Sequence, residues 1–369
     1  MVESQPQHVM IKAALADWTV TIPIASALLL IAAVYVPGNV VISVVCVAAL
    51  IAVVIAAVHH AEVVAHRVGE PFGTLVLALA ITVIEVALVV SMMFAGGAEK
   101  ATLARDSVYA AVMIICTGVV GICVLAGALR HREQSFRIEG AGPALAALVT
   151  LATMVLVLPV FTTTTPGPRY SNAQLAFIAA ASLALWAVFV FVQTVRHRDF
   201  FLPSEAADDE TVHAALPTLD QAWASFALLI VSLVTVVGLA KVLSPAIEAG
   251  VEAAGAPQAV IGVAIAMLVL LPEASAAVRA ALANRLQTSM NLALGSALAS
   301  IGLTIPVVAL ASVTLNLPLV LGLAGTDLVL LALAFLVSSI TLGTGRTSLM
   351  QGAVHLVIFA VFLFLTLVP

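Results

Sequence analysis

Three acidic side chains stand well inside long apolar runs of this 369-residue chain. They are Glu85, Glu273 and Asp327; the other sixteen of the 19 acidic residues lie in polar segments or at the ends of apolar runs. A charge at the centre of a bilayer costs about 3 kcal/mol on insertion scales, so such residues are functional candidates. Since no Lys or Arg lies mid-run beside Glu85 or Glu273, each needs a proton or a bound cation. That is the chemistry of cation/proton exchange.

The neighbours of the two glutamates offer further oxygens. Thr82 lies three residues before Glu85 and so shares its helix face. Proline at position 272 has no N–H, which leaves the carbonyl of Leu268 without its helical partner and able to face a cation. A stripe of small and polar residues follows in the next apolar run, and its predicted ligands are Ser296 and Ser300, with Asn291 and Gly295 beside them.

Other polar residues in apolar surroundings carry two interpretations each. Asp327 and His355 belong either to a proton path or to hydrogen bonds between helices. His59, Glu62 and His66 are spaced i, i+3 and i+7 and share one helix face. They form either an interfacial amphipathic turn or a place where cations or protons are captured at the cytoplasmic mouth.

The composition dictates which elements hold these residues. With 63% apolar and 9% charged residues, the chain cannot be a water-soluble globular protein, and 14 Lys and Arg residues cannot make a nucleic-acid-binding surface. The sequence predicts an all-α integral membrane protein. Eleven spans are predicted, at 18–36, 40–58, 72–95, 107–129, 141–161, 173–195, 222–240, 257–278, 289–313, 318–340 and 348–368.

Positive charge predicts the orientation of these spans. With the N-terminus inside, ten Lys and Arg residues fall in cytoplasmic segments and four in outer ones, which predicts a multi-pass inner-membrane protein with its C-terminus outside. The predicted parts are a tail with an extra helix (1–39), a first repeat (40–195), an acidic cytoplasmic loop (196–219) and a second repeat (220–369). The acidic stretch 204–210 is either a solvated linker or a cation-sensing segment.

The two glutamates lie five predicted spans apart, in spans three and eight. An odd offset makes the second copy cross the membrane in the opposite direction, as in the inverted repeats of secondary transporters, whose ion sites lie near the midplane. The sequence therefore predicts an inverted 5+5 repeat plus one extra N-terminal helix, with Glu85 and Glu273 as the shared cation- and proton-binding pair.

Two segments resemble the α-repeats of the Ca²⁺/cation antiporter superfamily, specifically the Ca²⁺/H⁺ exchanger branch and its bacterial ChaA-type members. The first runs from Glu62 to Val86 (EVVAHRVGEPFGTLVLALAITVIEV), and the second from Leu271 to Val307 (LPEASAAVRAALANRLQTSMNLALGSALASIGLTIPV). Plant and fungal exchangers place Gly-Asn before each glutamate, where this chain has Ile81-Thr82 and Val269-Leu270. A family Asn in the fourth span appears here as Thr117.

The resemblance implies a secondary transporter that exports Ca²⁺ in exchange for H⁺ by alternating access, with Ca²⁺ as the transported ion and no cofactor. With few side-chain oxygens beside the glutamates, Na⁺(K⁺)/H⁺ exchange stays open as the alternative. No metalloprotease or nucleophile-elbow motif favours an enzyme. The expected partners are the lipid bilayer and the transported ions, without nucleic acid, and a homo-oligomer is compatible with the sequence.

Overall fold

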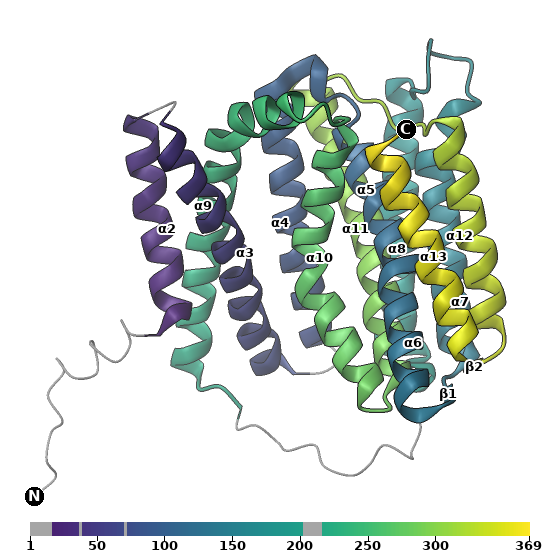
Figure 1. Cartoon of the computed structure of the whole chain (residues 1–369). Coiled ribbons are helices and arrows are strands. Elements are labelled where there is room, and N and C mark those ends of the chain that lie inside the picture. The colour runs from purple at the N-terminus through teal and green to yellow at the C-terminus, as the bar shows by residue number, and fades with distance from the viewer. Residues whose placement is uncertain (1–16, 37–38, 70–71, 202–215) are drawn as a thin grey trace, which may run out of the picture. The chain divides into compact units, whose positions relative to one another are not determined.

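Eleven apolar helices long enough to cross a membrane run through residues 17–36, 39–69, 72–201 and 216–369, the part of the chain that the computed structural model describes (Figure 1). This confirms the all-α membrane architecture and the predicted number of spans. The N-terminal tail, the turn residues 37–38 and the acidic stretch 204–210 lie outside the described residues.

Several spans consist of consecutive helical segments, because short π- and 3₁₀-helical stretches interrupt the α-helical pattern. The elements are α2 (Trp18–Tyr35), α3 (Val40–Val68), α4 (Phe72–Gly96), η1 (Gly97–Lys100), α5 (Leu103–Met113), η2 (Ile114–Val119), α6 (Val120–His131), β1 (Gln134–Ser135), α7 (Ile138–Ala152), η3 (Thr153–Val157), η4 (Leu158–Val160), α8 (Asn172–Phe191), η5 (Val192–Arg196), η6 (Arg198–Phe200), α9 (Leu219–Ala253), α10 (Ala259–Leu282), α11 (Leu286–Thr314), α12 (Gly325–Gly343), β2 (Arg346–Thr347) and α13 (Leu349–Leu367).

The chain divides into two compact units. Unit 1 comprises Met1–Ala95 and Ala214–Gly250, and unit 2 comprises Gly96–His213 and Val251–Pro369. Unit 1 therefore holds α2, α3, α4 and most of α9, and unit 2 holds the other spans. Glu85 belongs to unit 1, whereas Glu273 belongs to unit 2.

Specific polar contacts hold unit 1 together at the ends of its helices. Asp17 caps α2 by accepting the N–H of Thr19 at 3.0 Å. The ring Nε2 of His60 on α3 donates to the Thr19 carbonyl at 2.8 Å, which ties α3 to the first turn of α2. Arg67 near the end of α3 donates to the carbonyl of Pro217 at 3.3 Å and so ties α3 to the start of α9.

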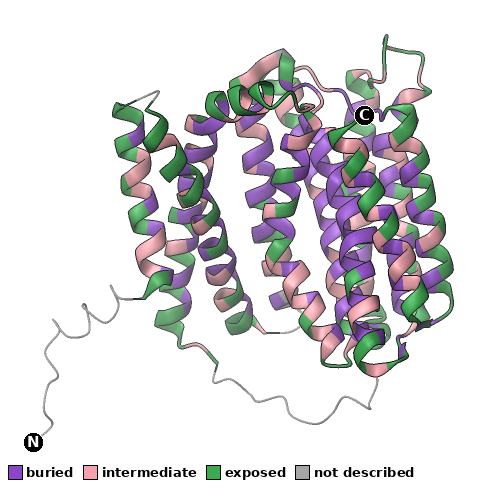
Figure 2. Ribbon diagram, in the orientation of Figure 1, coloured by how far each residue is buried: buried purple, intermediate pink, exposed green. Residues whose placement is uncertain are grey.

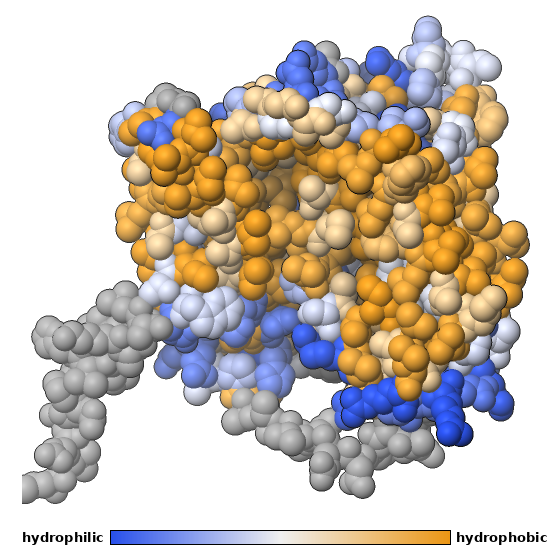
Figure 3. All heavy atoms as spheres, viewed as in Figure 1, coloured by the Kyte–Doolittle hydropathy of each residue, from blue (hydrophilic) through white to orange (hydrophobic). Residues whose placement is uncertain are grey.

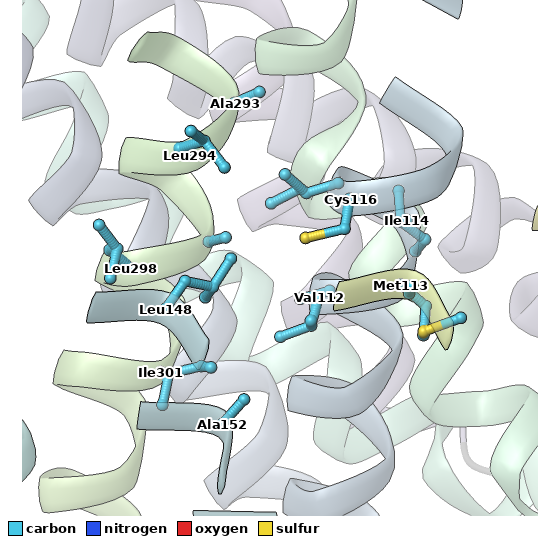
Figure 4. Close-up of a cluster of buried hydrophobic side chains, with 14 of the residues drawn as sticks. Val112, Met113, Ile114, Cys116, Leu148, Ala152, Ala293, Leu294, Leu298 and Ile301 are labelled. Atoms are coloured by element: carbon cyan, nitrogen blue, oxygen red, sulfur yellow. The ribbon is translucent and has the colours of Figure 1, made fainter. Parts of the chain in front are cut away.

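A continuous apolar core fills unit 2. Figure 2 shows buried residues along α5, α6 and α11, and Figure 4 shows side chains from α5, η2, α7 and α11 meeting in one cluster. The labelled members include Met113, Cys116, Leu148 and Leu298, all almost inaccessible to solvent. Apolar side chains also cover the face that α12 and α13 present in Figure 3, with hydrophilic ones at the end near β1 and β2, as expected for helices in lipid.

At that end of unit 2, three interhelical loops are fastened to one another. β1 and β2 form an antiparallel pair in which Gln134 lies opposite Thr347. The Gln134 amide also donates to the carbonyl of Ala281 at 2.8 Å and to the side chain of Asn284 at 3.0 Å. These bonds fix the ends of α6, α10, α11 and α12 relative to each other within the unit.

Three predicted span boundaries are wrong by seven residues or more. The second span continues to Val68 rather than residue 58, and the seventh to Ala253 rather than 240, because polar side chains at an exposed end do not break a helix. The tenth begins at Gly325 rather than 318. The preceding stretch has no regular secondary structure, and several of its backbone N–H groups pair elsewhere, including Val320 with the Ala101 carbonyl at 2.8 Å.

Candidate cation-binding site

Glu85 lies in the middle of α4 and is 2% exposed. Thr82, one turn earlier, is also buried, and its hydroxyl donates to the Ala78 carbonyl at 2.8 Å. A threonine hydroxyl has one proton and two lone pairs. Since the proton is used within the helix, the Thr82 oxygen can offer only lone pairs to its surroundings, which suits a cation.

Glu273 lies on α10 and is 7% exposed. The Ser296 hydroxyl of α11 donates to the Oε2 atom of Glu273, so the structure brings together the second glutamate and a hydroxyl of the predicted stripe. The arrangement places side-chain oxygens of Glu273 and Ser296 next to each other inside the apolar helix pair.

Pro272 lies inside α10, which remains helical from Ala259 to Leu282. Because proline has no N–H, the Leu268 carbonyl one turn earlier lacks its usual helical donor. Leu268 itself is half-buried. On the other side, the Ser275 hydroxyl donates to the Pro272 carbonyl at 2.7 Å. The backbone next to Glu273 is thus richer in oxygens than a regular helix.

The stripe on α11 extends beyond Ser296. Ser300 and Thr304 follow at four-residue intervals, and both are at most 2% exposed. Positions spaced by four lie on one helix face, so the hydroxyls form a buried polar line within unit 2. Asn291, five residues before Ser296, lies on another face of α11. It donates to the Phe201 carbonyl at 2.5 Å, a bond that links α11 to the residue after η6.

Thr117 is fully buried in η2, a π-helical stretch between α5 and α6. Its hydroxyl donates to the Met113 carbonyl. η2 packs against α10 and α11, the helices that carry Glu273 and Ser296. π-helical turns inside α-helices occur frequently at functional sites, and this one lies in unit 2 against the helices of Glu273 and Ser296.

Asp327 does not lie in the middle of a span, and its predicted placement is wrong. It belongs to the first turn of α12 and is half-buried. An acidic residue is favourable there because the N-terminus of a helix carries partial positive charge. Close by, Arg105 pairs with Asp106 at 2.7 Å and donates to the Gly322 carbonyl at 3.2 Å, so a charged network closes this end of unit 2.

His355 on α13 is fully buried and uses both ring nitrogens. Its Nδ1 lies 2.7 Å from the carbonyl of Cys116 in η2, and its Nε2 lies 3.0 Å from the hydroxyl of Thr341 on α12. The carbonyl can only accept, so Nδ1 carries the proton. The polar helix-to-helix contact that the sequence offered as one interpretation is therefore present.

His59, Glu62 and His66 lie within α3 rather than beyond it. His59 is half-buried and packs against the ring of Trp18 at 5.5 Å, whereas Glu62 and His66 are exposed. Among the described residues no group of three or more His, Cys, Asp or Glu side chains could hold a metal ion. Capture of cations by this face stays a prediction.

Comparison with known proteins gives these residues a family. Residues 38–195 and 224–368 match the family described as sodium/calcium exchanger protein. The chain belongs to this family. It is a member of the Ca²⁺/cation antiporter superfamily, as the two repeat-like segments indicated, and its function is ion transport by antiport.

Two relatives align with this exchanger over most of its length. It is 53% identical to the putative ionic transporter y4hA of Sinorhizobium fredii over 86% of each chain. It is 35% identical to the sodium-potassium/proton antiporter ChaA of Escherichia coli over 83% of each chain. The solved structure of native YfkE is similar in fold, with a TM-score of 0.71 at 19% identity, covering 95% of this chain and 100% of YfkE. A second YfkE structure, described as a Ca²⁺/H⁺ antiporter protein, gives a TM-score of 0.68 at 16% identity, covering 96% of this chain and 100% of that one.

Three features of the exchanger escaped sequence reasoning. The π-helical turns η2, η3 and η5 have no composition signal, because they differ from α-helix only in hydrogen-bond spacing. The Arg105–Asp106 pair near the start of α12 was detectable, since two adjacent opposite charges at the edge of an apolar run suggest an ion pair. His60, next to the predicted His59, is the buried histidine that carries a structural hydrogen bond.

Proposed function

We propose that this exchanger exports Ca²⁺ from the cytoplasm in exchange for H⁺ by alternating access, and that Glu85 and Glu273 are the carboxylates that bind cation and protons alternately. The observation that carries the proposal is the burial of both glutamates in apolar helices. A hydroxyl oxygen that could bind a cation lies one turn from Glu85 and on the helix next to Glu273. Two buried carboxylates carry two negative charges, which one divalent cation or two protons neutralise.

The proposed ligands differ between the units. In unit 1 they are Glu85 and the Thr82 oxygen; in unit 2 they are Glu273, the Leu268 carbonyl, Ser296, Ser300 and Thr117. Calcium takes six to eight oxygens, and carboxylates supply at most four of them, so hydroxyls, carbonyls or water complete the shell. Asp327 and the His59 face are proposed as approaches to this set for protons or cations.

A second candidate is Na⁺(K⁺)/H⁺ exchange. It is supported by the 35% identity to ChaA, which is named as a sodium-potassium/proton antiporter. It is also favoured by Leu270, which stands one turn before Glu273 and is buried without offering an oxygen. Fewer side-chain oxygens suit a monovalent ion better than Ca²⁺.

The decisive experiment is transport in reconstituted vesicles. An imposed pH gradient should drive uphill ⁴⁵Ca²⁺ accumulation, and unlabelled Na⁺, K⁺, Mg²⁺ and Mn²⁺ are compared as competitors. Accumulation of Na⁺ or K⁺ with no Ca²⁺ flux would select the second candidate. Flux that a pH gradient cannot drive uphill would indicate a channel and contradict both.

The site is tested with isosteric variants. Glu85→Gln and Glu273→Gln remove titration at nearly constant volume and should each abolish proton-driven flux. Glu139→Gln is the matched control, because Glu139 is exposed in the first turn of α7 and should retain transport. Near-normal exchange by either site variant would remove that glutamate from the mechanism.

The proposed orientation follows from charge. In unit 2, eight arginines lie near the end where β1 and β2 pair, and exposed positions such as Arg130, Arg132 and Arg346 are among them. An excess of Arg and Lys marks cytoplasmic segments. We therefore place this end in the cytoplasm of a bacterial inner membrane, with the N-terminus inside and the C-terminus outside.

A further inference from the structure

We infer that His355 is a positioning residue that holds the π-helical turn η2 in its register against α10 and α11, and that it is not a proton carrier. The inference rests on the proposed function in one respect, because it assigns η2 to the cation-binding half of unit 2. Its physical basis is a clasp between α13 and the fourth span, built entirely inside that unit.

The clasp begins with close helix packing. A Cβ atom added at Gly121 of α6 would lie 3.0 Å from the His355 Cβ, and one added at Gly118 of η2 would lie 3.2 Å from the Phe359 ring. On the α13 side, a Cβ at Gly352 would meet the backbone of Leu125. Three glycines therefore let α13 approach η2 and α6 more closely than any other residue type allows.

The close approach brings His355 to a backbone carbonyl inside the π-turn. At the end of the turn the Val120 N–H is shared between the carbonyls of Ile115 and Thr117. The carbonyl between these two acceptors, that of Cys116, does not accept from Val120. This is the carbonyl that accepts from His355 Nδ1 at 2.7 Å. A buried carbonyl without a donor costs about 1–3 kcal/mol, so the bond stabilises the turn as it stands.

The other ring nitrogen fixes the tautomer. Because Nδ1 holds the proton, Nε2 of the neutral ring is an acceptor, and the Thr341 hydroxyl at 3.0 Å is its donor. Thr341 is itself 1% exposed, and neither partner is charged. A proton carrier must take up and release a proton along a path. His355 instead has both nitrogens committed to neutral partners on η2 and α12.

The turn that is held in this way bears on the site. η2 contains Thr117 and packs against α10, which carries Glu273, and α11, which carries Ser296. Loss of the clasp should let η2 relax toward regular α-helix, which rotates every residue of the turn relative to those two helices. The expected effect is a change in cation affinity and selectivity rather than in the pH response.

The test compares three substitutions at His355. In His355→Asn the side-chain amide reaches the place of Nδ1 and can still donate to Cys116, so apparent KM and ion selectivity should stay within about twofold of wild type. In His355→Gln the amide lies nearer the place of Nε2, and in His355→Ala both bonds are lost. Both should raise the apparent KM for the cation about fivefold to tenfold without moving the pH midpoint of transport.

Gly121→Ala provides an independent arm in case His355→Ala does not fold. The added methyl group pushes α13 away while the histidine is intact, so it should reproduce the raised KM of His355→Ala. Gly250→Ala is the control, because a Cβ there meets no atom within 4 Å. Glu273→Gln is measured in parallel, because loss of flux in that variant tests the proposed carboxylate site independently of the clasp.

Two results would overturn the inference. If His355→Asn and His355→Ala both abolished proton-driven flux, and His355→Asn also shifted the pH midpoint of transport, His355 would carry protons. If His355→Ala or Gly121→Ala lowered thermal stability but left apparent KM and selectivity unchanged, the clasp would be packing alone. If Glu273→Gln transported normally while His355→Ala changed KM, the clasp would hold and the assignment of the carboxylate would fail.

Discussion

Replacing Pro272 with alanine should make the protein more stable and its cation affinity weaker, two effects of opposite sign from one change. Pro272 is the fourteenth residue of the 24-residue helix α10, so it is far from both ends. A proline in a helix interior costs about 3 kcal/mol relative to alanine. Pro272→Ala should therefore raise the free energy of unfolding by up to about 3 kcal/mol, with an N–H restored to the Leu268 carbonyl.

The same restored bond withdraws the Leu268 oxygen from the cation. If that oxygen contributes as a hydrogen-bonded carbonyl does, about 1–3 kcal/mol, affinity should fall about fivefold to hundredfold. The hydroxyl of Ser275 bonds to the carbonyl of residue 272, at 2.7 Å in the wild type, and that bond should persist in the variant. The change is thus confined to one backbone acceptor.

The assay is equilibrium ⁴⁵Ca²⁺ binding on purified protein, with thermal unfolding measured on the same samples. Pro306→Ala is the matched control, because Pro306 also lies inside a long helix of unit 2 but one not bearing a glutamate beside it. Both variants should gain stability, and Pro272→Ala alone should lose affinity. Unchanged affinity in Pro272→Ala together with raised stability would refute the role of the Leu268 carbonyl.

Three further outcomes are expected. Ser296→Ala and Thr82→Val should each weaken cation binding, because each removes a hydroxyl oxygen on the helix face or neighbouring helix of a buried glutamate; equilibrium ⁴⁵Ca²⁺ binding measures the loss, and unchanged affinity would remove that hydroxyl from the proposed ligands. Hydrogen bonds from Thr19 hold the pKa of the Asp17 carboxyl below its usual 3.8, so the stability that this N-cap contributes is present above pH 3.8 and is lost as pH falls through the lower pKa. Asp17→Ala should therefore lower the free energy of unfolding by about 1 kcal/mol at neutral pH. Thermal unfolding of both proteins should show this difference shrinking in acid. Deleting 204–210 should alter rate or regulation but leave the pH midpoint of binding unchanged, since Asp and Glu in model peptides titrate near pH 4; a moved midpoint would place that stretch in the transport site.

The spans could be predicted from sequence because the membrane imposes a simple rule. About 20 apolar residues are needed to cross the hydrocarbon, and every backbone group there must be paired within the helix. This rule gives the number of spans but not their ends. The helices α3 and α9 continue past polar residues before they end at Val68 and Ala253. The positive φ of 77° at Gly69 marks the end of α3.

The two glutamates of the candidate site stand out in the sequence more than its other members. Glu85 and Glu273 are conspicuous because a charge in an apolar run is rare, and the structure finds both buried. Asp327 illustrates the limit of the same argument. The run before it, LPLVLGLA, reads as apolar helix, yet residues 317–324 have no regular secondary structure, and three of their N–H groups pair with carbonyls elsewhere in unit 2. The aspartate therefore lies in the first turn of its helix rather than mid-span. Apolar composition cannot distinguish a helix from a buried irregular segment.

The two glutamates lie at matching positions of the predicted repeats, but the hydroxyl groups near them form different hydrogen bonds. The Thr82 hydroxyl donates its hydrogen bond to the Ala78 carbonyl, so near Glu85 its oxygen can offer only lone pairs. Ser296 differs, since its hydroxyl donates to the Oε2 atom of Glu273, an oxygen that a proton or a cation would also use. A proton or cation that takes up Oε2 therefore changes the Ser296 hydrogen bond, whereas the bond from Thr82 to the Ala78 carbonyl involves neither glutamate. We therefore expect the two hydroxyls to play separate parts in exchange: Ser296 should affect proton and cation binding at Glu273 together, and Thr82 should add only an oxygen ligand beside Glu85.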